Sequence, residues 1–134
     1  MIRTGATGLA LLSAAALTAC SGHSYQPPAR TSQIVAEEAR VAALIERHES
    51  GLFDDRPGTC AVRVLGMQAD STYAWADCTY PPNGGLSAPF RVDGHAVRNA
   101  QDGSLYSDSI KEMFPADLAQ AVLDDPERLR PAAS

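Results

Sequence analysis

The sequence lacks the short motifs that carry most enzyme chemistry. It contains no G-x-S-x-G, no Walker-type phosphate loop, no G-x-G-x-x-G and no H-E-x-x-H. Its histidines, His23, His48 and His95, fall in a predicted linker, helix and hairpin. The acidic pairs Asp54-Asp55 and Asp124-Asp125 lack the spaced oxygen ligands of a calcium loop. We therefore expect no catalytic residue, no metal site and no cofactor, and we predict that the protein is not an enzyme.

Positive charge is also scarce. The chain has 11 Lys and Arg residues against 16 Asp and Glu residues, which gives a formal net charge of −5, and Lys111 is the only lysine. A nucleic-acid-binding surface needs a basic patch, so this balance argues against a nucleic-acid partner. A chain of 134 residues, 45% of them hydrophobic, is long enough for one globular domain and too short for two sizeable cores.

The most apolar segment is too short to cross a membrane. After Arg3, residues 4–19 carry no charge, and the most apolar part covers residues 9–19. As a helix, this part would be about 16 Å long, roughly half of a bilayer core. A weakly positive start followed by an apolar segment of this length is typical of a secretory signal peptide.

The apolar segment ends in Leu17-Thr18-Ala19-Cys20. This tetrapeptide resembles the lipobox of bacterial lipoproteins, in which an aliphatic residue and two small residues precede a cysteine. The resemblance implies that residues 1–19 are a lipoprotein signal peptide, that cleavage precedes Cys20, and that acyl chains such as palmitate anchor Cys20 to the outer, extracytoplasmic face of the cell membrane. The alternative is a buried apolar helix that contains a cysteine by chance.

Residues 20–31, CSGHSYQPPART, are polar and contain two prolines, so we predict a flexible tether. Such a tether would reach roughly 20 Å on average and about 40 Å at full stretch. We predict a single domain over residues 32–125 and a C-terminal tail over residues 126–134. Loss of Arg3 with the signal peptide changes the charge from −5 to −6. We therefore expect an anionic domain that stands off the bilayer.

Hydrophobic periodicity predicts an α+β fold in two layers. It indicates a helix over residues 33–50, strands over residues 59–67, 72–80, 87–92 and 95–99, and one or two short helices between residues 107 and 123. Asp93-Gly94 is the strongest hairpin signal. The expected architecture is an N-terminal helix, a four-strand antiparallel meander and short C-terminal helices.

Lipidation would use Cys20 and leave Cys60 and Cys78 in an oxidising compartment, where two cysteines usually pair. We predict one disulfide between directly opposed residues of adjacent strands, with Cα atoms about 5.5 Å apart. This register also places Val64 opposite Ala74. The alternative is two separate buried thiols.

The same register divides the first two strands into two faces. One face carries no charge and should lie against the helices. The other holds the candidate binding face, which consists of Arg63, Leu65, Tyr73 and Trp75. We expect Trp75 to be partly accessible there, with Arg63 opposite it. The alternative is that the C-terminal segment covers these residues.

Residues 60–123 contain CAVRVLG, YAWADC, SAPFRV and MFPADL in this order. They resemble small uncharacterised lipoproteins of high-GC Gram-positive bacteria, a resemblance that implies no assigned activity. We expect a lipid-anchored lipoprotein that serves as a non-catalytic binding or accessory module, with the membrane and an envelope protein or glycan as partners. The alternatives are an envelope hydrolase that uses a carboxylate pair and a structural spacer without a ligand.

Overall fold

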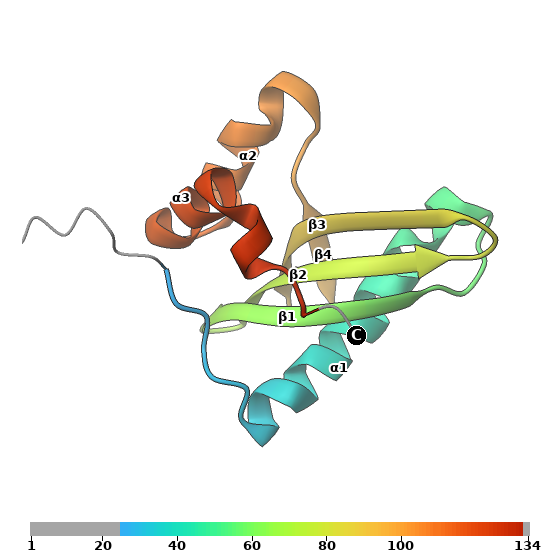
Figure 1. The fold of residues 1–134 in the computed structure, drawn as a ribbon, viewed down its shortest axis with the longest axis horizontal. Helices are drawn as coiled ribbons and strands as arrows, with labels where there is room; N and C mark the ends of the chain where they lie inside the picture. The colour runs from blue at the N-terminus through green and yellow to red at the C-terminus, as the bar shows by residue number, and fades with distance from the viewer. Residues whose placement is uncertain (1–24, 133–134) are drawn as a thin grey trace, which may run out of the picture.

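The computed structural model describes residues 25–132, which include three helices and four strands (Figure 1). Their order is α1 (Ser32–Glu49), β1 (Thr59–Gln68), β2 (Ser71–Tyr80), β3 (Gly84–Asp93), β4 (Ala96–Asn99), α2 (Tyr106–Met113) and α3 (Ala116–Asp124). Short 3-10 turns η1 (Ser50–Phe53), η2 (Gly103–Leu105) and η3 (Pro126–Leu129) follow α1, precede α2 and follow α3. The predicted α+β fold is confirmed.

Helix α1 forms where the sequence predicts it. The Thr31 side chain accepts a hydrogen bond from the Ile34 N–H and caps the start of the helix. Val41, Leu44 and Ile45 recur at helical spacing and bury one stripe of α1. This stripe docks the helix on one face of the sheet.

The four strands form an antiparallel meander in the order β1-β2-β3-β4, so β1 and β4 are its edges. Gly94, with φ of 62°, supplies the left-handed residue of the β3–β4 turn, as the Asp-Gly signal predicts. The structure starts β3 at Gly84, three residues before the predicted start at residue 87. Pairing of Gly84 with Tyr80 extends the β2–β3 hairpin to this point.

The predicted register between β1 and β2 is confirmed as far as Val64, which lies opposite Ala74. A β-bulge then shifts the register, and Gly66 takes the place opposite Tyr73 that the sequence assigned to Leu65. Gly66 has a steric reason to lack a side chain, because a Cβ atom there would lie 2.8 Å from the Tyr25 hydroxyl. The bulge thus accommodates the N-terminal segment that crosses β1.

Cys60 and Cys78 form the predicted disulfide, and their Cα atoms are 4.0 Å apart, closer than the expected 5.5 Å or so. The Cys60 N–H points away from β2 and donates to Glu46 Oε1 at 2.9 Å. Opposed antiparallel residues whose N–H groups point away from each other belong to a non-hydrogen-bonded pair, in which Cα atoms approach more closely. The disulfide therefore links β1, at the edge of the sheet, to the central strand β2.

The sheet is covered on both faces, so the prediction of two layers is wrong and the domain has three. Helix α1 packs on one face, and α2, α3 and η3 pack on the other (Figure 1). Each face has its own hydrophobic core. The first core contains the disulfide and Phe90, and the second contains Trp75 and Ile110.

The ordered domain is also longer at both ends than predicted. Residues 25–31 are not a free tether, because Tyr25 packs against the second core and the Arg30 guanidinium donates twice to Glu38. The predicted C-terminal tail contains η3, whose Leu129 is fully buried. Both corrections have the same cause: each segment contributes an apolar side chain, Tyr25 or Leu129, to the second core. Residues 1–24, with the predicted signal peptide, Cys20 and the first part of the tether, lie outside the described residues.

Candidate functional site

The predicted aromatic binding face is part of the interior. Leu65 is 0%, Tyr73 4% and Trp75 5% exposed, so the expectation that Trp75 is partly accessible is wrong. The buried residues that cover this face come from α2, α3, η3 and the α2–α3 connection: Ile110, Met113, Phe114, Leu118, Ala119, Val122 and Leu129. The alternative reading, in which the C-terminal segment covers the aromatic residues, is the one the structure bears out.

The polar groups of these aromatic residues have partners inside the protein. Trp75 Nε1 donates to Ser87 Oγ at 2.8 Å, and the Tyr73 hydroxyl donates to Gln68 Oε1 at 3.2 Å. A guanidinium does lie over an aromatic ring, but it is that of Arg91, 5.9 Å from the centre of the Tyr73 ring. Tyr73 and Trp75 are therefore core residues whose polar groups form hydrogen bonds within the protein.

Arg63 behaves differently from the other three predicted residues. It lies opposite Trp75, as the register predicts, but its Nη1 atom donates to the Arg128 carbonyl oxygen at 2.7 Å. Its side chain thus extends over the β1 edge towards the C-terminal segment. There it lines a groove that the sequence does not predict.

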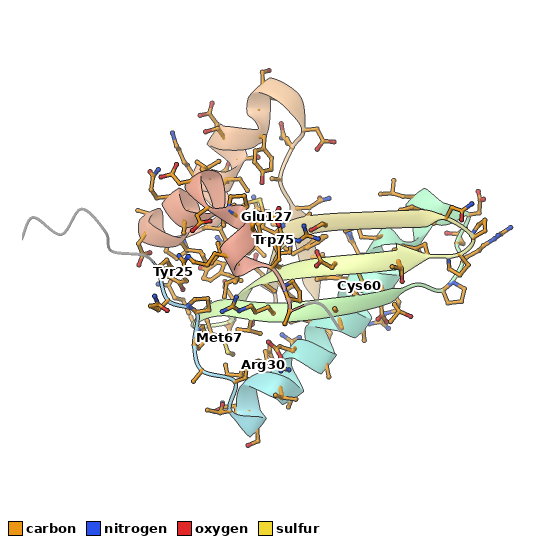
Figure 2. The ribbon with its side chains drawn as sticks, in the orientation of Figure 1. Tyr25, Arg30, Cys60, Met67, Trp75 and Glu127 are labelled. Carbon is orange, nitrogen blue, oxygen red and sulfur yellow. A yellow bond between two sulfur atoms is a disulfide. The ribbon has the colours of Figure 1, made fainter. Side chains whose placement is uncertain are left out.

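This groove, called the edge groove below, has a volume of about 740 Å³ and straddles the outer edge of β1. It is lined by residues 27–30, residues 61–63, residues 130–132 and Glu38. One wall is the N-terminal segment that leads into α1, and the opposite wall is the segment that follows η3. Figure 2 shows Arg30 beside α1, on the first of these walls.

The floor of the edge groove is strand backbone that faces away from β2. The N–H of Cys60 donates to Glu46, and the N–H of Val64 donates to Glu38 Oε2 at 3.0 Å. Because N–H groups of a strand alternate in direction, the Val62 N–H between them points to the same outer side. Carboxylates from α1 thus occupy the edge on either side of Val62, whose backbone lies at the groove.

Three arginines and one glutamate line the edge groove, and carboxylates pair with two of these arginines. Arg30 is paired with Glu38 at 2.8 Å, and Arg130 lies 3.3 Å from Asp77 Oδ2. The hydrogen bond to Asp77 raises the pKa of Arg130 above its ordinary value. Carboxylate partners thus position Arg30 and Arg130, and the Arg128 carbonyl oxygen positions Arg63.

A second hollow, of about 600 Å³, contains the carboxylates of Glu37 and Asp93. Hydrogen bonds from Arg40 lower the pKa of Glu37, and the hydrogen bond from Ser71 lowers the pKa of Asp93. Both groups are therefore ionised at neutral pH. A hydrolase that uses a carboxylate pair needs one member that retains its proton, whereas the hydrogen bonds to Glu37 and Asp93 stabilise the charged form of both.

Two walls of the groove were not predicted because they lie in segments assigned to a tether and a tail. Arg30 and Arg130 belong to those segments, whereas Arg63 was predicted as part of the aromatic face. Two signals could have pointed to this site: β1 is the first strand of a meander and therefore an edge, and arginines flank the predicted domain on both sides.

A comparison of the chain with protein-family models, curated proteins and solved structures finds no match in any of the three. Within residues 25–132, no helix combines the length and apolar character that crossing a bilayer requires.

Proposed function

We propose that the protein is a lipoprotein, anchored through acyl chains on Cys20 to the outer face of the cell membrane, and that it works there as a non-catalytic binding module. The observation that carries the anchor is the position of Leu17-Thr18-Ala19-Cys20 at the end of an apolar segment of signal-peptide length. The Cys60–Cys78 disulfide supports an extracytoplasmic location, because disulfides persist in oxidising compartments.

The edge groove is the binding surface in this proposal, and its ligand is an extended, negatively charged segment of an envelope protein. Support comes from the Val62 N–H, which points outward from an edge strand between two N–H groups that Glu46 and Glu38 occupy. It suits one main-chain hydrogen bond to an extended chain. The guanidinium groups of Arg63 and Arg130 beside it suit carboxylates. The groove thus combines main-chain pairing with a charge preference.

The anchor is tested by cell fractionation of the Cys20→Ala variant. The variant has no thiol to acylate, so we expect it to remain as an uncleaved precursor or to be released from the membrane fraction. Normal membrane retention of a processed Cys20→Ala protein would rule out the lipoprotein assignment.

The binding role is tested by crosslinking on intact cells, followed by purification of the anchored protein. Arg63→Ala removes a groove guanidinium, and Arg98→Ala is the matched control, because Arg98 lies on β4 at the opposite edge of the sheet. We expect a crosslinked partner that Arg63→Ala loses and Arg98→Ala retains, with similar thermal midpoints for both variants. If no partner depends on the groove, the spacer alternative is favoured over a binding module.

A further inference from the structure

The N-terminal segment is fixed to the domain from Tyr25 onwards. The Tyr25 hydroxyl donates to the Leu65 carbonyl oxygen, and Arg128 Nη1 donates to the Tyr25 carbonyl oxygen at 2.7 Å. The ring also packs against the second core. The domain surface next to Tyr25 is therefore where the chain towards Cys20 departs.

The chain between the predicted anchor and this fixed point is short. Five Cα-to-Cα steps separate Cys20 from Tyr25, and a fully extended chain covers at most about 17 Å over that distance. A domain of this size has a radius of gyration of about 13 Å, which corresponds to a diameter of roughly 34 Å. If Cys20 is lipidated, as the proposed function requires, the Tyr25 end of the domain cannot lie a domain diameter away from the lipid headgroups.

The Tyr25 end also carries exposed apolar side chains. Met67, at the end of β1, is 45% exposed, and Val35, in the first turn of α1, is 44% exposed. A hollow of about 420 Å³ beside Met67 is lined in part by Tyr25, Pro28 and Ile34. Figure 2 shows Met67, Tyr25 and Arg30 at the same end of the molecule, away from Cys60.

We propose that this surface, formed by Val35, Met67 and the hollow beside Tyr25, rests on the headgroup layer of the membrane that holds Cys20. Apolar side chains beside a cation are typical of interfacial surfaces, and the Arg30 side chain, which is 64% exposed, presents its guanidinium to lipid phosphates while it pairs with Glu38. The inference rests on the proposed lipidation of Cys20. It replaces the expectation of an anionic domain held away from the bilayer.

In this arrangement, the acyl chains rather than the net charge determine the distance between the domain and the bilayer. Each buried methylene contributes about 0.8 kcal/mol, so one long acyl chain contributes roughly ten times that amount or more. Interaction of one exposed charge with an anionic leaflet is worth about 1 kcal/mol and decays over a Debye length of about 8 Å. Repulsion by the anionic leaflet therefore reorients the domain within the reach of its tether but does not detach the domain from the membrane.

Oxidation of Met67 tests the orientation. The lipidated mature protein is reconstituted in vesicles of phosphatidylcholine with phosphatidylglycerol, treated with hydrogen peroxide, and analysed by peptide mass spectrometry. The reference is the unacylated mature chain with Cys20→Ser, mixed with the same vesicles. We expect anchoring to slow sulfoxide formation at Met67 at least threefold. Leu52→Met introduces the matched control in η1, just beyond the opposite end of α1, where Leu52 is 72% exposed. The oxidation rate at this position should not change.

A longer tether separates orientation from anchoring. Insertion of ten Gly and Ser residues between Ser24 and Tyr25 should restore Met67 oxidation to the reference rate while the protein still floats with the vesicles. An acylated, floating protein in which Met67 oxidises at the reference rate would overturn the orientation and leave the lipoprotein assignment standing. An N-terminal peptide without acyl mass, from a host that processes lipoproteins, would overturn the lipoprotein assignment and the orientation together.

Discussion

Truncation of Trp75 to alanine should remove a large part of the stability of this domain. The side chain is 95% buried in the second core, below α2, α3 and η3. Its Nε1 atom donates to Ser87 Oγ, and Ser87 in turn donates to Asp77. Trp75→Ala therefore leaves a cavity in the core and also removes the N–H group that donates a hydrogen bond to the Ser87 hydroxyl.

The magnitude follows from the buried area. A tryptophan buries about 150–250 Å², and at about 25 cal/mol per Å² this corresponds to roughly 4–6 kcal/mol for the complete side chain. Alanine retains one methyl group and the site collapses in part, so we expect a loss of about 3–5 kcal/mol in the free energy of unfolding. Small domains have a total free energy of unfolding of about 5–15 kcal/mol, so the Trp75→Ala variant should be only marginally stable.

The loss is measured by urea unfolding, followed by far-UV circular dichroism because the variant has no tryptophan fluorescence. Trp75→Phe is the matched control: it keeps most of the apolar contacts, loses the Nε1 hydrogen bond, and should cost about 1–2 kcal/mol. A loss below about 1 kcal/mol for Trp75→Ala, with an unchanged denaturant slope, would refute the burial of this face and restore the aromatic binding surface.

Three further results are expected. Reduction of the disulfide, which spans 18 residues, should cost about 3 kcal/mol and lower the thermal midpoint by more than about 10 °C; a shift of only a few degrees would contradict this estimate. Glu38→Ala should cost about 1–3 kcal/mol because the Val64 N–H then lacks its acceptor, whereas the exposed control Glu112→Ala should cost less than about 0.5 kcal/mol. Glu37 and Asp93 have lowered pKa values, so their stabilisation is complete above the unfolded-state values and is lost as the pH falls below about 5. The double variant Glu37→Gln with Asp93→Asn should show a weaker decrease of the thermal midpoint on acidification, and an unchanged decrease would refute this role.

Much of the fold could be predicted because strong local signals agree with one long-range constraint. The stripe of α1, the Asp93-Gly94 turn and the two cysteines together determine the elements and most of the β1–β2 register. The bulge was also signalled, since glycine inside a strand marks a bulge or a close approach. Gly66 lies at a bulge and also close to the Tyr25 hydroxyl. Tyr25 is too distant in the sequence for a local pattern to predict this contact.

The candidate site was misplaced because all helices were assigned to the charge-free face of the sheet. A second set of large apolar residues, including Tyr73 and Trp75, requires its own cover, and α3 offers Leu118 and Val122 on one side for this purpose. Apolar residues on both faces of a strand pair therefore indicate three layers. The edge groove depends on side chains that reach across the fold, and no local pattern encodes such contacts.

The contact between Arg128 and the carbonyl oxygen of Tyr25 joins residues that are 103 positions apart. In a chain that is synthesised from its N-terminus, this contact forms only after Arg128 has been made. Until then, Tyr25 lacks one of the contacts that fix it to the domain. Full docking of Tyr25 therefore requires a residue from the far end of the domain and is expected to be a late step of folding.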